Sequence, residues 1–334
     1  MREYSLPCSS GKWGPVSGFA PSRGLRQGDP ISPYLFIICA EVLSNMVRME
    51  AERGAIKGIR VCRNAPEVTH LFFADDSIFF CRAEERNVEA ITRVLNRYSA
   101  ASGQETNFSK SEVSLSTNVP NDGKMVLAEK LGVRLVNGHG SYLGMPTVIG
   151  KSKTRAFSYL KERVWKRLKR LKGWKQQLLS FAGREILLKA VVQAIPTYIM
   201  SLFRLPLSLC NDIQSMMARF WWGGKDNAKK ISWVSWNNLS KKKVDGGMGY
   251  RRIIDFNEAL LAKQAWRIMN MPELLSSRIL RARYFPNGSF LNSGVGCRPS
   301  YIWRSIGAAN GSWRKVANGW LATVKGCEFG VTRG

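Results

Sequence analysis

The pattern of apolar and polar positions predicts a long helix near the start of the chain. Residues 34–53, with apolar residues at Leu35, Phe36, Ile37, Ile38 and Val42, predict this helix, with Ser32 as its N-cap, Pro33 as its first residue and Gly54 as its stop. Because this segment is apolar on several faces, we expect the helix to be buried.

The strongest local pattern lies at residues 68–80, where two runs of β-branched and aromatic residues flank Asp75 and Asp76. This arrangement predicts two strands joined by a tight turn, with both carboxylates at the tip of the hairpin. Carboxylates in an apolar hairpin are costly unless something neutralises them, and Mg²⁺ is suited to do so because it prefers hard oxygen ligands. A solvated turn is the structural alternative, since Asp is common in turns.

The segments around this hairpin predict a mixed domain. Amphipathic patterns indicate helices at residues 84–102 and 122–131, each followed by glycine. Short strands are expected at residues 57–62, within 104–117 and at 141–146. We therefore expect residues 25–146 to form an α+β domain with a mostly antiparallel sheet.

The character of the chain changes near Gly150. Residues 151–190 carry 13 Lys and Arg, and apolar residues recur among them at helical spacing, which predicts a basic helical region. Further helices are expected at residues 182–194, 207–222, 257–269 and 274–284. We expect three parts, namely residues 1–150, 151–222 and 223–334, of which the last is helical with an irregular tail.

The composition favours a polyanionic partner. The 334 residues include 51 Lys and Arg against 24 Asp and Glu, a formal net charge of +27, and an apolar content of 45% is typical of globular proteins. Nucleic acid is the simplest such partner, and an anionic membrane surface is the other. The sequence contains no uninterrupted run of 18 apolar residues, which a membrane-spanning helix would require, so we expect no membrane partner. Without a C-x-x-C motif or a signal-peptide pattern, the seven cysteines indicate reduced, mostly buried thiols in a nuclear or cytoplasmic protein.

Two short motifs carry a resemblance to a known family. Arg26-Gln27-Gly28-Asp29-Pro30, with Ser32-Pro33 beyond it, is followed by Phe73-Ala74-Asp75-Asp76. Their order and separation resemble the reverse transcriptase domain of plant non-LTR (LINE-type) retrotransposons. Asn107 with Lys110, and then Tyr142-Leu143-Gly144, resemble the next two motifs of that family, and the resemblance covers roughly residues 20–307.

The resemblance implies a partial polymerase palm in residues 1–150, followed by a helical thumb. It implies DNA synthesis on an RNA template from a DNA primer and deoxynucleoside triphosphates (dNTPs), with two Mg²⁺ ions. It assigns catalysis to Asp75, Asp76 and Lys110, metal binding to Asp75 and Asp76, and template or nucleotide binding to Arg26, Gln27, Gly28, Phe73 and Ala74. It assigns the primer grip to Tyr142, Leu143 and Gly144, and contacts with the nucleic-acid backbone to Lys161, Arg163, Lys166, Arg167, Lys169 and Arg170.

The family's palm also requires a carboxylate on an earlier strand, whereas only Glu3 lies upstream of Asp29 here. We therefore interpret the chain as an N-terminally truncated polymerase that lacks the first catalytic carboxylate and the fingers, and we expect the isolated chain to be inactive. Two alternatives stay open, a non-catalytic basic nucleic-acid-binding protein and a pseudogene product. The structural alternatives are an ordinary loop before a helix for Gln27 and Gly28, a solvated side chain for Lys110, and sheet packing for Tyr142 to Gly144.

Overall fold

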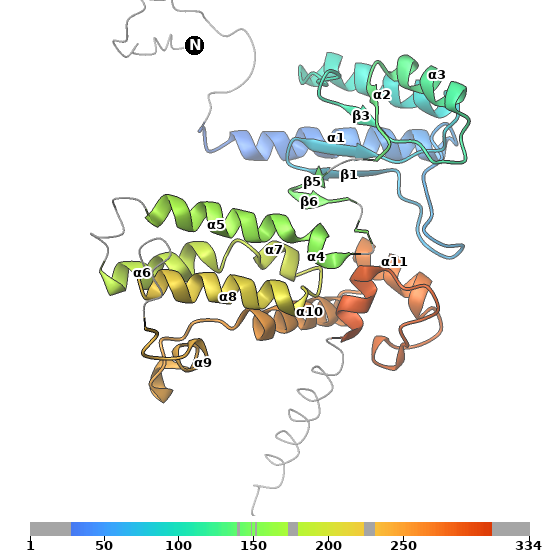
Figure 1. Ribbon diagram of the computed structural model, residues 1–334. Helices are drawn as coiled ribbons and strands as arrows, with labels where there is room; N and C mark the ends of the chain where they lie inside the picture. Colours follow the sequence, from blue (N-terminus) through green and yellow to red (C-terminus); the bar gives the residue numbers. More distant parts are fainter. Residues whose placement is uncertain are drawn as a thin grey trace, which may run out of the picture. The chain divides into compact units, whose positions relative to one another are not determined.

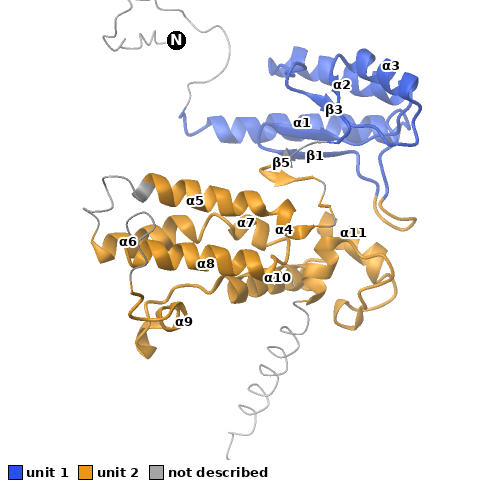
Figure 2. Ribbon diagram, viewed as in Figure 1, with its two compact units in different colours: residues 1–60, 67–138 blue, residues 61–66, 139–334 orange. Residues whose placement is uncertain are grey.

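The computed structural model describes residues 28–138, 141–147, 149–150, 152–172, 180–223 and 231–308 (Figure 1). The chain forms two compact units, which we call the first unit (residues 1–60 and 67–138) and the second unit (residues 61–66 and 139–334) (Figure 2). The first unit contains α1 (Ser32–Glu52), β1 (His70–Phe73), β2 (Asp76–Phe79), α2 (Glu85–Ser102), β3 (Glu112–Val113), α3 (Asn121–Leu131) and β4 (Arg134–Leu135). The second unit contains β5 (Ser141–Tyr142), β6 (Met145–Pro146), α4 (Lys153–Ala156), α5 (Ser158–Lys172), α6 (Phe181–Leu187), η2 (Leu188–Val192), α7 (Thr197–Met200), α8 (Leu207–Trp221), α9 (Trp236–Leu239), η3 (Lys243–Asp245), α10 (Ile253–Asn270), α11 (Leu275–Tyr284) and η4 (Phe290–Asn292). The three-part division expected from the sequence stays a prediction.

In the first unit, α1 and α2 pack with the β1–β2 hairpin around one hydrophobic core. The hairpin contributes the rings of Phe72 and Phe79, whose centroids lie 5.7 Å apart. Helix α2 ends at Gly103, which has φ +73°. It buries the stripe that its pattern predicts, Val88, Ile91, Leu95 and Tyr98. The amphipathic pattern therefore identified both the limits and the buried face of this helix.

Helix α1 is covered along only part of its length. Its C-terminal half supplies Leu43 and Val47 to the core. Among the described residues, none before Cys39 belongs to a hydrophobic core, and Ile37 and Ile38 are 64% and 60% exposed. The expectation that the whole helix is buried is therefore wrong, because among the described residues α1 contributes to a hydrophobic core only from Cys39 onward.

The start of α1 differs by one residue from the prediction. The N-cap is Ile31, and Ser32 is already helical. The side chain of Asp29 supplies the polar acceptor, since its Oδ1 accepts a hydrogen bond from the N–H of Ile31 at 3.0 Å. The Asp29 carboxylate therefore stabilises the turn that precedes α1, and the N-cap residue Ile31 makes no capping hydrogen bond with its side chain.

The described strands form three separate two-stranded sheets. The β1–β2 and β5–β6 pairs are antiparallel, and β3 pairs with β4 in parallel. The strand expected at residues 57–62 is reduced to a bridge between Ile59 and Val68, and residues 104–117 contribute only β3. Strand-like composition does not produce a strand unless a neighbour is available for pairing. The α+β class is nevertheless confirmed, because small sheets and helices mix in the first unit.

The second unit is built mainly from helices around one large core. Helix α5 places Leu160, Val164 and Leu168 on this core, and α8 adds Ile213 and Met217. A smaller core forms around the buried Trp303 with α10 and α11. The helices predicted at residues 207–222, 257–269 and 274–284 correspond to α8, α10 and α11, whereas the one predicted at 182–194 is α6 continued by the π-helical turn η2.

A buried amide joins α10 to the segment between α7 and α8. Asn257 is 3% exposed, and its Oδ1 accepts a hydrogen bond from the N–H of Leu205 at 2.8 Å. Its Nδ2 donates to the carbonyl oxygens of Met200 at 2.7 Å and Phe203 at 2.9 Å. One side chain thus satisfies three backbone groups away from water, which fixes the segment that leads into α8.

Two expectations from composition concern cysteines and membranes. The described cysteines, Cys39, Cys62, Cys81, Cys210 and Cys297, are free thiols. Only Cys210 of these five is buried, so the prediction of mostly buried thiols is wrong. Within the described part of the chain, no helix combines the length and the apolar character that crossing a membrane requires.

Candidate active site

The two carboxylates of the central motif lie at the end of the β1–β2 hairpin. Phe73 pairs with Asp76 across the strands, so Ala74 and Asp75 form a two-residue turn. Ala74 has φ +51°, a left-handed conformation that costs a non-glycine residue about 1–2 kcal/mol. A positive φ at the first turn residue occurs in type II′ turns, whose twist matches that of the flanking strands. The predicted hairpin is therefore confirmed, with Asp75 in the turn and Asp76 as the first residue of β2.

The hairpin presents one face to the core and the other to solvent. Phe72 and Phe79 pack in the core, and the Phe73–Asp76 pair lies on the opposite face because side chains alternate along a strand. Phe73 is 60% exposed, and Asp75 and Asp76 are exposed as well. No hydrogen bond or ion pair to another described residue involves either carboxylate. Their oxygen atoms are therefore available to a cation or to water.

A histidine fixes the base of this hairpin. His70 begins β1 and hydrogen-bonds Ser44 of α1 (Oγ to Nε2, 2.8 Å) and Thr69 (Oγ1 to Nδ1, 2.9 Å). Burial lowers the pKa of His70 below 6.5, the charge of Arg48 lowers the pKa further, and Glu41 opposes this shift. The neutral ring ties α1 to the strand that ends in the carboxylates. No sequence pattern marked this role of His70, because the residue has no metal-ligand spacing to a cysteine.

Lys110 lies in a turn that Asn107 organises. The side-chain oxygen of Asn107 accepts hydrogen bonds from Ser109 Oγ at 2.7 Å and from the N–H of Lys110 at 3.2 Å. The carbonyl oxygen of Asn107 accepts a further bond from Ser111 Oγ at 2.9 Å. An Asn side chain commonly stabilises a turn in this way, which explains the spacing of Asn and Lys in the motif. The Lys110 side chain is exposed, and its role at a triphosphate stays a prediction.

Only Gly28 of the predicted Arg26-Gln27-Gly28 segment can be placed, because Arg26 and Gln27 lie outside the described residues. Gly28 has φ +88°, and a Cβ built on it would meet no atom within 4 Å. Glycine is therefore required there for its backbone conformation and not for lack of space.

The predicted primer-grip motif forms a second two-residue hairpin, in the second unit. Tyr142 pairs with Met145, and the turn residues Leu143 and Gly144 have φ +50° and +75°, the φ pattern of a type I′ turn. Leu143 and Ala74 are the two non-glycine residues with positive φ in the described part of the chain. Backbone strain of this kind clusters at functional sites, and here it occurs in both motif-bearing turns.

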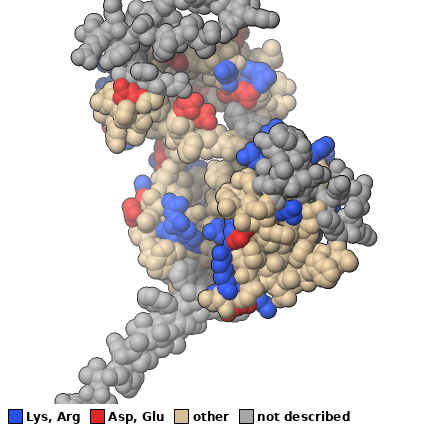
Figure 3. Space-filling view, turned by 90° about the vertical axis from the view of Figure 1, so that its left-hand side faces the viewer, with Lys and Arg blue, Asp and Glu red and all other residues tan. Residues whose placement is uncertain are grey.

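Within residues 161–170, helix α5 exposes its basic residues, while Val164 and Leu168 are buried. Two of the predicted backbone contacts have carboxylate partners, Lys161 with Asp212 at 2.6 Å and Lys166 with Glu162 at 3.9 Å. The other four are exposed and have no ion pair to a described residue, namely Arg163, Arg167, Lys169 and Arg170. Figure 3 shows Lys and Arg more often than Asp and Glu on one face of the second unit.

The tip of the β5–β6 hairpin lies close to this basic helix. A Cβ built on Gly144 would be 3.8 Å from Nη1 of Arg163. The primer-grip motif and one of the unpaired cations therefore share a surface within the second unit. The carboxylate hairpin, Gly28 and Lys110 belong to the first unit.

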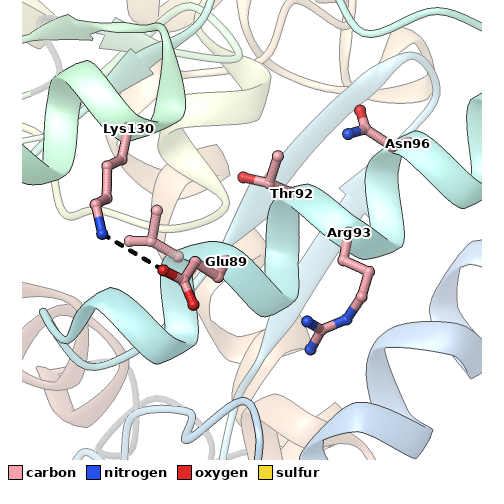
Figure 4. A pocket seen from close by; sticks show the side chains of 6 residues that line it. Glu89, Thr92, Arg93, Asn96 and Lys130 are labelled. Carbon is pink, nitrogen blue, oxygen red and sulfur yellow. Dashed lines mark hydrogen bonds and ion pairs between the residues drawn. The ribbon is translucent and has the colours of Figure 1, made fainter.

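A surface cavity of about 510 Å³ lies beside α2 and α3 in the first unit. It is lined by Val88, Glu89, Thr92, Arg93, Asn96 and Lys130 (Figure 4). Lys130 pairs with Glu85 at 2.6 Å and with Glu89 at 3.4 Å, and Arg93 pairs with Glu50 at 3.6 Å. Because carboxylates neutralise its cations and no predicted site residue lines it, we assign this cavity no role.

The hairpin offers a metal ion two carboxylates. Within the described residues, no group of three or more His, Cys, Asp or Glu side chains could hold a metal ion. Two adjacent exposed carboxylates still fit Mg²⁺, which typically binds one or two carboxylates together with substrate phosphates. Asp75 and Asp76 therefore fit a cation whose other ligands come from elsewhere.

Comparison with known proteins identifies the family. An uncharacterized mitochondrial protein of Arabidopsis thaliana is 54% identical over 114 residues, which cover 34% of this chain and 74% of the relative. A second uncharacterized mitochondrial protein of that plant is 63% identical over 57 residues, 17% of this chain and 47% of the relative. An Arabidopsis protein named for ribonuclease H is 32% identical over 173 residues, 48% of this chain and 26% of the relative. The chain thus spans about half or less of two of these three proteins.

The family itself is given by a match over residues 2–160 to the model described as reverse transcriptase (RNA-dependent DNA polymerase). This range includes both two-residue hairpins and Lys110. It ends within α5, so the helices that follow lie outside the matched range. The chain belongs to the reverse transcriptase family.

Proposed function

We propose that this chain is part of a LINE-type reverse transcriptase, in which the β1–β2 hairpin bears the metal-binding carboxylates and the second unit binds nucleic acid. Members of this family act on a nucleic-acid template with nucleotide substrates and depend on divalent metal ions. The observation that carries the proposal is the hairpin tip. There Asp75 and Asp76 are exposed, have no partner among the described residues, and follow a strained turn residue.

In this proposal, Asp75 and Asp76 hold Mg²⁺, which when bound stabilises charge on the attacking 3′-oxygen and on the leaving pyrophosphate. Phe73 and Ala74, with Arg26, Gln27 and Gly28, contact the template and the incoming nucleotide. Lys110 brings a positive charge to the triphosphate.

The second unit offers a surface for the nucleic-acid backbone. Arg163, Lys166, Arg167 and Arg170 recur at i, i+3, i+4 and i+7, so they share one face of α5. Seven residues of helix span about 10 Å. Phosphates of one strand are spaced by about 3.4 Å along a duplex axis, so this face can reach about three of them. The Tyr142–Gly144 turn beside Arg163 holds the primer end in this proposal.

Fluorescence anisotropy with an RNA–DNA template–primer across a range of salt concentrations tests this surface. Replacement of Arg163, Arg167 and Arg170 by Gln removes three contacts that release counterions, so the slope of log K against log salt becomes shallower by about 2–3. Lys161→Gln is the matched control on the same helix, because Asp212 already neutralises Lys161. Equal slopes for the wild type and the triple variant would contradict the assignment of α5.

We also propose that the isolated chain does not extend a primer, because the described residues offer a bridging pair of metal ions only two carboxylates, which leaves the pair under-coordinated. The test is primer extension on an RNA template with Mg²⁺ and dNTPs, with Asp75→Asn as the paired variant. Incorporation by the wild type that disappears in Asp75→Asn would overturn the proposed inactivity and support the metal role of the hairpin. Adding an upstream palm and finger fragment in trans should restore activity to the wild type and not to Asp75→Asn.

The alternatives are a non-catalytic nucleic-acid-binding protein and a product without a selected role. The unpaired cations of α5 favour binding over the absence of any role. Steeply salt-dependent binding, together with no Asp75-dependent activity in the complemented assay, would support the non-catalytic alternative. A nuclear or cytoplasmic location is part of the proposal, in keeping with the free thiols of the described cysteines.

A further inference from the structure

A second cavity lies in the second unit, between the end of α10, α11 and the loop that follows α11. Its volume is about 330 Å³, close to the lower end of the range of about 300–1,000 Å³ that is usual for small-molecule sites. The apolar part of its wall comes from Ile268, Met269, Phe285, Phe290 and Leu291. Phe285 and Phe290 both pack on the buried Trp303, with ring centroids 5.7 and 5.6 Å from that of the indole. The wall is therefore part of a hydrophobic core, and the cavity does not depend on a ligand for its shape.

Two polar side chains of α11 line the same cavity, one turn apart on one face of the helix. Ser277 is 3% exposed, and its Oγ has no hydrogen-bond partner among the described residues. Arg281 is exposed, and its guanidinium makes no hydrogen bond or ion pair with a described residue. Buried polar groups in native proteins almost always have a partner. Because Ser277 lines the cavity, a ligand bound there can supply the missing partner.

The charge and the aromatic wall of the cavity together select a class of ligand. Among the described residues that line it there is no Asp or Glu, and Arg281 is the only charged residue, so an anion is favoured. The side chains of Phe285 and Phe290 favour a flat ring as the body of the ligand. A nucleotide combines a flat base with a phosphate, a group that Arg binds with two parallel hydrogen bonds. An unpaired base of a single strand can enter such a cavity, whereas a base stacked inside a duplex cannot.

We propose that this cavity binds one unpaired nucleotide of a single-stranded nucleic acid, with its phosphate on Arg281 and its base against Phe285 and Phe290. The hydroxyl of Ser277 completes its hydrogen bonding with a polar atom of the same nucleotide. The inference rests on the proposed binding of nucleic acid by the second unit, but it assigns a separate site, because no residue of α5 lines the cavity. Contact between a base and aromatic side chains tolerates all four bases, so the site holds a strand without reading its sequence.

Ligand-observed NMR titration of the full chain with 5′-AMP and 5′-dAMP tests the proposal. One phosphate and one base offer few contacts, so we expect dissociation constants of about 0.1–1 mM. Adenosine and inorganic phosphate each lack one half of the nucleotide and should bind at least about tenfold more weakly. Binding of either nucleotide supports the proposal, and the tighter of the two shows whether the strand is RNA or DNA.

Substitutions in α11 locate the site. Arg281→Gln should weaken the binding of 5′-AMP at least about tenfold, because it removes the charge that holds the phosphate. Arg278→Gln is the matched control and should change the affinity less than about twofold, since Arg278 is an exposed arginine of the same helix that has no ion pair to a described residue and does not line the cavity. Ser277→Ala should weaken binding about three- to tenfold. The same substitution should leave the urea midpoint of the free chain unchanged or raised, because alanine removes a buried hydroxyl that has no partner.

Four results would overturn the proposal. These are no binding of either nucleotide at about 5 mM, equal weakening by Arg278→Gln and Arg281→Gln, inorganic phosphate that binds as tightly as 5′-AMP, and N-acetylphenylalanine that binds as tightly as 5′-AMP. The second would indicate general attraction to a basic surface, the third a bare anion site, and the fourth a peptide ligand. The α5 triple variant with Gln at positions 163, 167 and 170 should bind 5′-AMP like the wild type. Loss of 5′-AMP binding with an unchanged salt slope for template–primer binding would therefore refute the cavity and leave the assignment of α5 intact.

Discussion

Substitution of the buried amide in α10 should cause a large loss of stability. Asn257→Ala removes three hydrogen bonds to backbone groups of residues 200–205. It leaves one N–H and two carbonyl oxygens without this partner in the core of the second unit. The segment between α7 and α8 would then lose its attachment to α10.

The size of the stability loss in Asn257→Ala follows from the number of hydrogen bonds that the substitution removes. A buried hydrogen bond contributes about 1 kcal/mol net, and a buried polar group left unpaired costs about 1–3 kcal/mol. Alanine favours a helix by up to about 0.7 kcal/mol relative to asparagine, which offsets a small part of the loss. We therefore expect Asn257→Ala to lower the free energy of unfolding of the second unit by about 3–5 kcal/mol.

Urea unfolding followed by tryptophan fluorescence measures this loss. All tryptophans except Trp13 belong to the second unit, so the signal reports on the unit that contains Asn257. With a slope of about 2 kcal/mol per molar urea, the midpoint should fall by about 1.5–2.5 M. Asn270→Ala is the matched control in the same helix, because Asn270 is exposed and donates one bond to the Trp266 carbonyl at 2.9 Å. Its expected loss is below about 0.5 kcal/mol.

Asn257→Asp keeps the volume of the side chain, so it measures the effect of the hydrogen bonds separately from the effect of lost packing. This carboxylate would still accept from the Leu205 N–H but would face two carbonyl oxygens, which disfavour its charged form and raise its pKa. The variant should therefore recover stability as pH falls. A loss in Asn257→Ala that is within about 1 kcal/mol of the Asn270→Ala value would refute the reasoning, because the three bonds would then contribute almost nothing net.

Three further predictions concern single residues. Ala74→Gly should change the stability of the first unit by less than about 1 kcal/mol, and Ala74→Val should lose about 1–2 kcal/mol in urea unfolding followed by circular dichroism, because only glycine adopts the left-handed turn conformation at low cost. Equal losses would contradict this. The pKa of His70 is lower in the folded chain than the ordinary value of 6.5. The neutral His70 ring therefore contributes its full stabilisation above pH 6.5, and this stabilisation is lost as the pH falls through the pKa of the folded state. The stability of His70→Asn should therefore vary less between about pH 7 and pH 5 than that of the wild type, and parallel pH profiles would exclude the effect. Burial raises the pKa of Cys210 to about 11, so a thiol reagent at about pH 8 should modify the exposed Cys297 in the native chain and leave Cys210 unmodified, as mass spectrometry of the labelled peptides would show.

Local features were predictable from the sequence because their causes are local. The two runs of strand formers around Asp75 and Asp76 define the β1–β2 hairpin without help from the rest of the chain. Helices α2 and α3 end where the chain reaches Gly103 and Gly132, both with positive φ. The exposure of the carboxylates follows from their place at a hairpin tip.

Features that depend on distant partners were not predictable in the same way. Residues 57–62 have strand-like composition and form only one bridge, since pairing requires a second strand at the right place. The N-terminal half of α1 has the composition of a core and lies exposed, because composition does not show which face finds a neighbour. Backbone strain at Ala74 and Leu143 also went unpredicted, although two-residue connections between antiparallel strands require positive φ.

Because Phe73 pairs with Asp76, the fold of this hairpin is more sensitive to a change in its length than to a change of a residue on its solvent-facing side. Residues on β1 and β2 alternate between the two faces, so a one-residue insertion or deletion inside either strand would reverse every side chain beyond it. Phe72 or Phe79 would turn outward, and a charged group would turn toward the apolar interior. Point substitutions can accumulate at the solvent-facing positions with little effect, whereas a single in-frame codon gained or lost would remove both the packing and the carboxylate tip.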